Sequence, residues 1–218
     1  MDSIPNPVVL LPLLLGLSLA PFLAIMVSSY LKIVIVLTLV RNALGLQQVP
    51  PNMMINGLAI ILSVYVMAPT GHAVHQQLGA VSLDSQALLQ PENRAALSRS
   101  VEPVRSFLEK HADDRQTQFF VQAASRLWPE DQAQDITESS LLVLVPAFTV
   151  TELIEAFETG FMLFLPFVVI DLVISSILLA MGMFMVSPMM VSLPFKLLLF
   201  VMADGWTRLL QSLVLGYQ

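Results

Sequence analysis

The chain has 218 residues, of which 56% are hydrophobic and only 12% are charged, and its mean hydropathy is +0.77. A soluble domain carries about 25% charged residues, so this composition indicates an integral membrane protein. The net charge of −6 does not suggest nucleic-acid binding, and the absence of cysteine excludes disulfides, thiolate metal sites and cysteine nucleophiles.

The first apolar block runs from Val8 to Val40, with Lys32 as its only charge. It is longer than the about 20 residues that one spanning helix needs, and Pro21 lies inside it. We therefore expect a kink or a short hairpin near Pro21. The leader Met1–Ser3 has no positive residue and the apolar run exceeds a signal-peptide core, so we interpret the block as a retained membrane segment.

A connector, residues 41–52, separates this block from a second apolar block, Met53–Pro69. Gly45 can end a helix, and Pro50-Pro51 can open the next one. Residues 1–70 are thus expected to form an N-terminal unit of hydrophobic helices. His72 and His75 mark its exit to water. They could be half of a metal site, but no cysteine or nearby acidic ligand completes it, so we expect neither metal nor cofactor.

Residues 71–140 hold ten of the sixteen acidic and six of the ten basic residues, and we interpret them as a water-exposed insert. Two apolar stripes predict two or three amphipathic helices, with Pro103 interrupting the first and Trp128-Pro129 ending the second. The stripes are Leu97, Val101, Val104 and Leu108, then Phe119, Phe120, Ala123, Ala124 and Leu127. A small helical cap that closes its own core is favoured over a groove for a partner.

Residues 141–218 form the last unit, a hydrophobic helical hairpin. Its first arm begins at Leu141, Ser187-Pro188 breaks the helix, and the last block is Pro194–Tyr217. The fold class is therefore an all-α membrane protein of kinked hydrophobic hairpins with a helical soluble insert. Arg41 and Lys32 favour a cytoplasmic connector, which places the insert and both termini on the far side of four segments.

Charged side chains lie within the apolar C-terminal unit, where hydrocarbon does not tolerate them unpaired. If the hairpin turns near Met189, Asp171 and Arg208 lie at similar depth and form a buried charge pair. Lys196 would face residues that offer no anion, so we expect its partner to come from elsewhere. The available carboxylates are Glu152, Glu155 and Glu158, of which 152 and 155 share a helix face, as do 155 and 158.

The hypothesis that follows is a pair between Lys196 and a glutamate of a neighbouring copy. Two alternatives stay open: Lys196 snorkels to an interface, and Asp171 serves as a proton relay.

A methionine cluster, Met181-Gly182-Met183-Phe184-Met185, lies between the two arms of the hairpin. On a helix Met181 and Met185 share a face, whereas on an extended segment all three methionines point the same way. A ring of flexible methionines from several copies would block ions and still yield to a polypeptide. From the residues alone, simple packing between helices is favoured over such a ring. No phosphate loop, nucleophile elbow or pair of catalytic carboxylates is visible, so we expect no enzyme.

Several ordered motifs resemble the FliP/SctR family, the core export-gate proteins of flagellar and virulence type III secretion systems. The resemblance covers nearly the whole chain and is weakest in 71–140. Two features favour the virulence, or injectisome, branch. They are the missing flagellar-type cleavable signal and the amino-acid sequence of residues 47–52. The motifs are Arg41-Asn42-Ala43-Leu44-Gly45, Gln47-Gln48-Val49-Pro50-Pro51-Asn52, Gly57-Leu58-Ala59, Leu144-Val145-Pro146-Ala147-Phe148, Thr151-Glu152-Leu153, Ile170-Asp171-Leu172-Val173, Leu193-Pro194-Phe195-Lys196-Leu197 and Asp204-Gly205-Trp206.

The resemblance implies a non-enzymatic subunit of an export gate in the bacterial inner membrane. It implies a homo-oligomer of five copies that forms a helical cone with two smaller membrane partners, the S and T components. The cone would sit inside the basal-body rings beside other export-gate proteins, project to the periplasmic side, and conduct unfolded secreted polypeptides.

The resemblance also assigns roles to single residues. It implies a pore gasket at Met181, Met183 and Met185, with a departure at Phe184, where many relatives carry another methionine. It implies an intersubunit salt bridge between Glu152 and Lys196. A small ion or proton transporter that uses Asp171, and a plain membrane scaffold, are the alternatives to be tested.

Overall fold

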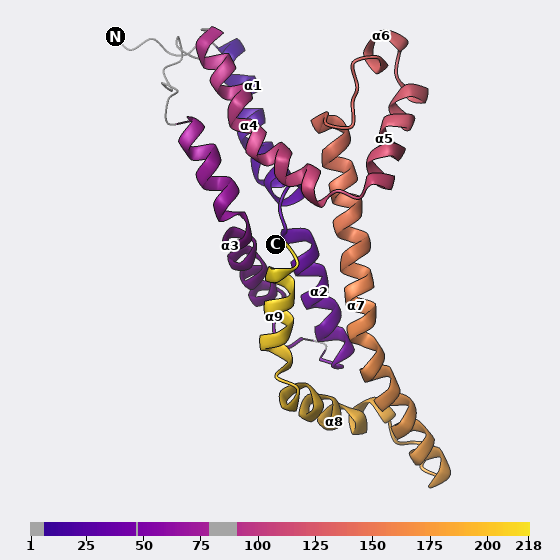
Figure 1. Ribbon diagram of the computed structural model, residues 1–218. Helices are drawn as coiled ribbons and strands as arrows, with labels where there is room; N and C mark the ends of the chain where they lie inside the picture. Colours follow the sequence, from indigo (N-terminus) through magenta and orange to yellow (C-terminus); the bar gives the residue numbers. More distant parts are fainter. Residues whose placement is uncertain (1–6, 47, 79–90) are drawn as a thin grey trace.

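The structure, a computed structural model, describes residues 7–46, 48–78 and 91–218, and every regular element in these ranges is an α-helix (Figure 1). The all-α fold class expected from the sequence is therefore confirmed. In chain order the helices are α1 (Pro7–Met26), α2 (Tyr30–Ala43), α3 (Asn52–Leu78), α4 (Pro91–His111), α5 (Asp114–Leu127), α6 (Glu130–Ala133), α7 (Leu141–Ala180), α8 (Pro188–Met202) and α9 (Gly205–Leu215).

Helix α7 is the long axis of the molecule. It begins at Leu141, as predicted, and its 40 residues include Pro146 and Pro166. At about 1.5 Å per residue it is about 60 Å long, which is about twice the thickness of the hydrocarbon core of a bilayer. A part of α7 must therefore lie outside any single bilayer that it crosses upright.

Helix α2 packs against both α7 and α3 and supplies more buried residues to the main core than any other helix. Its core residues are Ile33, Val36, Leu37 and Val40, all buried. Gly160 of α7 lets the two helices approach, because a Cβ atom there would meet the side chain of Leu39.

Helices α1 and α2 are separated by a bend of 58° at residues 27–29, so the break expected near Pro21 is displaced. Pro21 lies inside α1. At the observed break, the backbone N–H of Tyr30 donates to the hydroxyl of Ser28, and the hydroxyl of Ser29 donates to that of Ser63. Serine hydroxyls that bind nearby polar groups compete with helix continuation, and that competition sets the break here.

The connector between α2 and α3 follows the sequence prediction. Gly45 has a φ of +78°, the left-handed conformation that ends a helix after Ala43, and α3 starts just after Pro50-Pro51. Helix α3 then continues through Pro69 to Leu78. The expected boundary between residues 70 and 71 therefore falls inside a helix.

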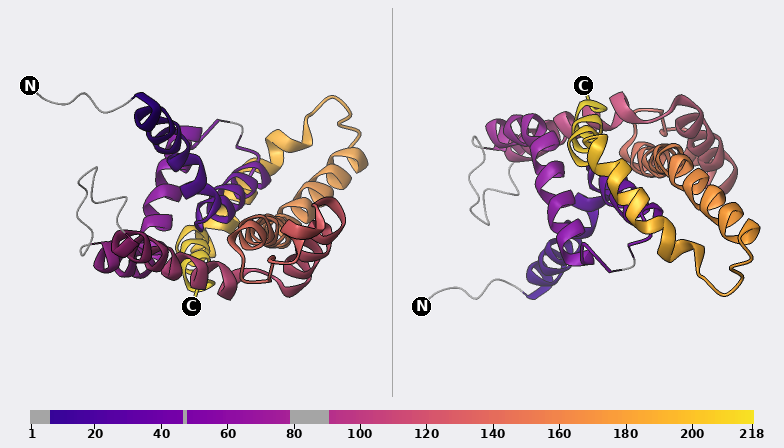
Figure 2. Two further views of the ribbon diagram at one scale, coloured as in Figure 1. Left: turned by 90° about the horizontal axis from the view of Figure 1, so that it is seen from above. Right: turned by 90° about the horizontal axis from the view of Figure 1, so that it is seen from below.

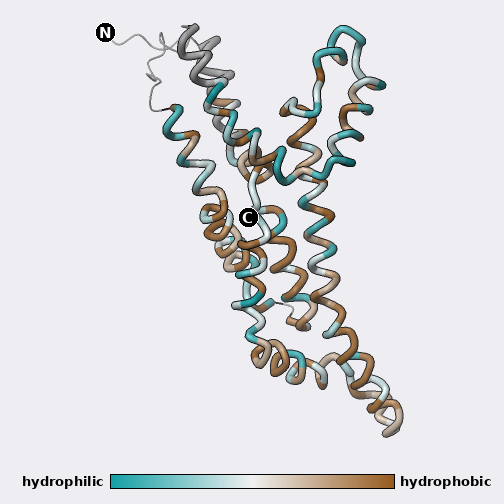
Figure 3. Tube along the Cα trace, in the orientation of Figure 1, coloured by the Kyte–Doolittle hydropathy of each residue, from teal (hydrophilic) through white to brown (hydrophobic). Residues whose placement is uncertain are grey.

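The described part of the insert holds α4, α5 and α6, which gather the hydrophilic residues at one end of the molecule (Figure 3). Pro103 lies inside α4 and does not divide it. Asp113 caps α5, because its carboxylate accepts from the backbone N–H of Arg115 at 2.7 Å. Leu108 of α4 packs with Leu144 and Phe148 of α7, and α5 also packs on α7. The insert helices therefore pack on α7, and α4 also on α3, instead of closing a core of their own as expected from the sequence.

Helices α8 and α9 form the returning arm of the hairpin. Proline opens α8, and the chain bends by 60° around Asp204, whose φ is +56°, before α9 runs back along α2. Leu209 and Leu213 of α9 are buried in the same core as α2. Views from both ends show α9 lying between α3 and α7 (Figure 2).

Two helices of the described residues, Asn52–Leu78 and Leu141–Ala180, are long and apolar enough to cross a membrane. Two bent pairs, Leu14–Met26 with Tyr30–Ala43 and Pro188–Met202 with Gly205–Leu215, raise the number to four if each pair is one span. The upper value of this range equals the four apolar segments expected from the sequence.

Candidate functional site

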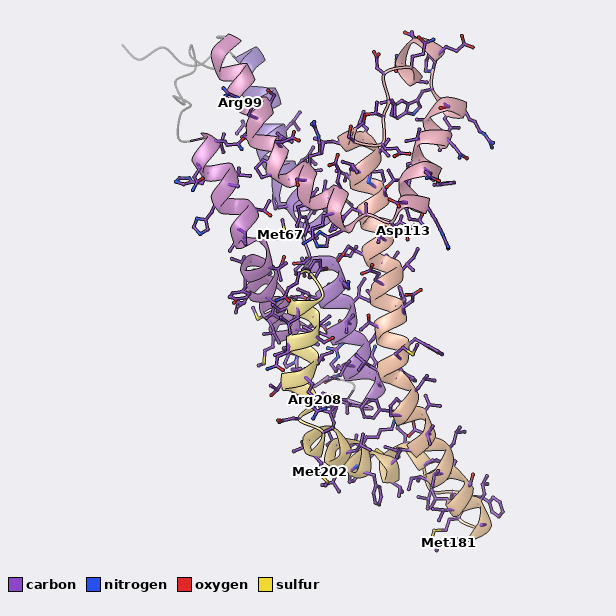
Figure 4. The ribbon with its side chains drawn as sticks, in the orientation of Figure 1. Met67, Arg99, Asp113, Met181, Met202 and Arg208 are labelled. Atoms are coloured by element: carbon purple, nitrogen blue, oxygen red, sulfur yellow. The ribbon has the colours of Figure 1, made fainter. Side chains whose placement is uncertain are left out.

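The methionine cluster forms an exposed loop at the tip of the α7–α8 hairpin (Figure 4). Gly182, with a φ of +74°, ends α7, because its N–H donates to the carbonyl of Leu179 and the N–H of Met183 donates to that of Leu178. The loop residues Met181, Met183, Phe184 and Met185 are all exposed, and Met185 is fully so. The loop is neither a continued helix nor an extended segment, and it carries four large apolar side chains with little cover from the rest of the chain.

Lys196 lies in a second cluster, where α8 crosses α7. Its Nζ donates to Asp171 Oδ2 at 2.6 Å and to the carbonyl of Ala43 at 3.2 Å. Lys196 as a whole is only 3% exposed. The hydroxyl of Ser192 donates to the other carboxylate oxygen of Asp171 at 2.6 Å. One ammonium therefore joins α8 to α7 and to the end of α2.

This geometry corrects two sequence-based expectations. Asp171 is paired with Lys196 and not with Arg208, and Lys196 finds an anion within its own hairpin. The expectation assumed two straight arms turning near Met189. In the structure α8 starts at Pro188 and bends away by 60° into α9, so the residues that reach Asp171 belong to α8, and Arg208 lies exposed on α9.

Glu152 lies in a third cluster, at the base of the insert. It is 1% exposed, and its carboxylate accepts a hydrogen bond from the hydroxyl of Tyr217. Burial, together with the charge of Glu152, raises the pKa of Tyr217, which keeps this phenol protonated as the donor. Lys32 forms an ion pair with Glu155, and its Nζ lies 5.0 Å from the centre of the Tyr217 ring.

Sequence reasoning missed Tyr217, Lys32 and Ser192 as members of these clusters. The hydroxyl of Tyr217 and its carboxylate partner are 65 residues apart in the chain. No periodic pattern or spacing signals a contact of that kind, so only the docking of α9 along α2 reveals it.

Glu152 and Lys196 do not meet within one chain. Lys196 is bound to Asp171, and at about 1.5 Å per residue the stretch of α7 from Glu152 to Asp171 is about 28 Å long. Only a second copy could bring a Lys196 close to this Glu152.

The connector carries a further buried charge, Arg41. Its Nη1 donates to the side chain of Asn52 at 2.6 Å and to the carbonyl of Pro50 at 3.2 Å. These bonds tie the two ends of the connector together. His72 and His75 are exposed on α3, and the described residues include no group of three or more side chains that could hold a metal ion.

The fold and these clusters define a class: an all-helical membrane protein in which buried ion pairs join apolar helices and large apolar faces remain exposed. Comparison with known sequences identifies the family. The chain belongs to the FliP family, whose family model matches residues 13–213.

Individual relatives match along the full length. The Yop proteins translocation protein R of Yersinia pestis is 50% identical over 217 residues, which is 100% of this chain and 99% of the relative. The hypersensitivity response secretion protein HrcR of Ralstonia nicotianae is 46% identical over 213 residues, 96% of each chain. The virulence protein YscR of Salmonella typhimurium is 44% identical over 216 residues, 99% of each chain.

Proposed function

We propose that this chain is a subunit of a type III secretion export gate, in which several copies form a pore that conducts unfolded polypeptides across the bacterial inner membrane. The observation that carries the proposal is the end-to-end similarity to relatives named as translocation and secretion proteins. Those names also favour the virulence branch over the flagellar one. The proposed partners are further copies of the chain, five in the complete ring, and two small membrane proteins, the S and T components.

The exposed apolar faces of α7 support an assembled state. Large apolar side chains are exposed in the single chain along α7 from Leu142 to Leu179, among them Phe157 and Phe161. A helix of about 60 Å cannot cover such faces with lipid along its whole length. Neighbouring copies and small partners would cover the remainder, with the insert on the periplasmic side.

The methionine loop is the proposed seal of this pore. Copies arranged around an axis would bring their loops together at the tip of each hairpin. Thioether side chains are flexible and apolar, so a ring of them blocks hydrated ions and deforms around a passing chain. Phe184 is stiffer than methionine and would contribute bulk to the same ring.

A salt bridge between Glu152 of one copy and Lys196 of the next stays part of the proposal. Both side chains are buried beside partners of their own chain, Tyr217 and Asp171. Assembly would therefore have to exchange these partners. The transporter alternative needs Asp171 as a proton carrier, but a carboxylate held by an ammonium and a hydroxyl is better suited to joining helices.

The proposal is tested by co-expressing the chain with the two small partners and measuring the extracted complex by native mass spectrometry. We expect one large complex that contains several copies of this chain and both partners. A monomer or dimer that ignores the partners would reject the gate and bring the transporter alternative forward.

A further inference from the structure

An apolar groove of about 350 Å³ lies between α7 and α9, with α8 at one end and α2 behind it. Its walls include Met162, Pro166 and Phe167 from α7, Phe200 from α8, and Leu209 from α9. Arg208 is the single charged residue among those that line it. The groove is therefore apolar along its length and carries one positive charge.

The guanidinium of Arg208 lies exposed near the start of α9 (Figure 4). It forms no ion pair with any carboxylate among the described residues. An arginine within an apolar surface of a membrane protein is stable only with an anionic partner or water. The groove therefore has room for an apolar segment that also brings a negative charge.

Such a segment is present on the opposite side of α7. Ile154, Phe157, Phe161 and Leu165 are all exposed and, at helical spacing, form one apolar ridge that faces away from α2. Glu158 lies within this ridge and is also exposed, with no ion pair to any of the described residues. The ridge is thus the counterpart of the groove, because it is apolar and carries one negative charge.

We propose that the α7 ridge of one copy occupies the groove of the next copy, and that Glu158 of the first pairs with Arg208 of the second. This inference rests on the proposed homo-oligomer and names the surfaces that build it. A planar guanidinium accepts a carboxylate through two parallel hydrogen bonds, which fixes orientation as well as contact. Since ridge and groove are different faces of one chain, the contact is head-to-tail and repeats from copy to copy, as a ring or helical cone requires.

A second copy suits the groove better than a phospholipid does. A lipid could supply acyl chains for the walls and a phosphate for Arg208. It would leave Glu158 unpaired on an apolar ridge. A neighbouring copy pairs both charges and covers both apolar surfaces in the same contact.

Cross-linking between single-cysteine copies tests the contact, because the native chain contains no cysteine. One copy carries Glu158→Cys and a differently tagged copy carries Arg208→Cys, and both are co-expressed with the small partners. A short bis-maleimide reagent then bridges the two thiols across the gap that the long Glu and Arg side chains fill, which is too wide for a direct disulfide. We expect a cross-linked dimer that contains both tags. The matched control replaces Arg208→Cys by Met202→Cys, which is also exposed but lies outside the groove lining. The inference is overturned if the control links as well as the test pair, or if neither links.

Charge exchange gives an independent readout on the same complex. Arg208→Glu or Glu158→Arg alone should lower the yield of the multi-copy complex by about tenfold, as loss of a desolvated charge pair and its replacement by like charges do. The double exchange should restore most of the yield.

The outcomes separate this inference from the proposed function. A normal yield from each single variant, with a complete native complex, would reject the Glu158–Arg208 contact and leave the export gate standing. Loss of co-purified phospholipid from Arg208→Glu without loss of assembly would assign the groove to lipid and also reject the contact. Absence of any multi-copy complex from the native chain would reject both.

Discussion

Lys196 is a buried charge that connects three helices in the apolar part of the molecule. Its ammonium binds the carboxylate of Asp171 and the carbonyl of Ala43, so it holds three helices at one point. A buried ammonium is tolerated only with partners of this kind, and removing one of them leaves an uncompensated charge. The pair therefore joins α7 and α8 in the single chain.

The variant Asp171→Asn tests this joint, because it removes the neutralising charge and keeps an acceptor for Ser192. We expect the free energy of unfolding in detergent to fall by about 2 kcal/mol. The loss should be smaller than for a fully enclosed pair, because the Asp171 side chain is 39% exposed. Adding Lys196→Met should recover most of the stability, since no unpaired charge then remains. A single variant as stable as the native chain would contradict the joint.

At the scale of helices, the close approach of α2 and α7 depends on Gly160. A Cβ atom at this position would lie 3.1 Å from Leu39 Cβ, a contact that the two helices cannot relieve by a side-chain rotation alone. We expect Gly160→Ala to lower the free energy of unfolding by about 1–2 kcal/mol through overpacking. The measurement is thermal unfolding of the purified chain in mild detergent.

Gly71 provides the matched control for that experiment. It lies within helix α3, and an added Cβ would meet nothing within 4 Å. Gly71→Ala should therefore be stabilising by about 0.5–1 kcal/mol, the usual gain from replacing glycine inside a helix. Equal effects from the two variants would show that the approach of α2 and α7 does not limit substitution at Gly160.

Helix boundaries that depend on local chemistry were predictable from the sequence. Gly45, Leu141 and Pro129 each stand at the boundary that their local signals indicate. Pro21 and Pro103 were expected to interrupt helices and do not, because a membrane-type or well-packed helix tolerates the loss of one backbone hydrogen bond. A local rule fails where tertiary packing compensates for its cost.

The candidate site was likewise predictable only where its residues are neighbours in the sequence. The methionines are consecutive in sequence, so their clustering on one loop needed no tertiary information. The partner of Asp171 depended on where α8 begins and on a bend of 60° after it, neither of which hydropathy encodes. The Glu152–Tyr217 bond required the return of α9 to the base of the insert.

At the scale of the whole molecule, opposite ends of the chain have different characters. The insert end is hydrophilic, and the hairpin end is apolar and terminates in the exposed methionine loop (Figure 3). In water a single copy would expose its apolar hairpin end, and in lipid it would bury its hydrophilic insert end. An assembly that buries the α7 faces and gathers the loops around an axis satisfies both.

That arrangement predicts a specific defect when the loop is made small. Replacing Met181, Met183 and Met185 together by alanine removes bulk at the tip and leaves the buried α2–α7 core unchanged. We expect the complex to assemble normally and to leak ions several-fold faster from K⁺-loaded vesicles, because alanine cannot fill the constriction that methionine seals. The control is the triple alanine variant of Met53, Met54 and Met202, which are as exposed but lie outside the loop. If both variants leak equally, the effect is a general loss of packing, and if neither leaks, the loops do not close a pore.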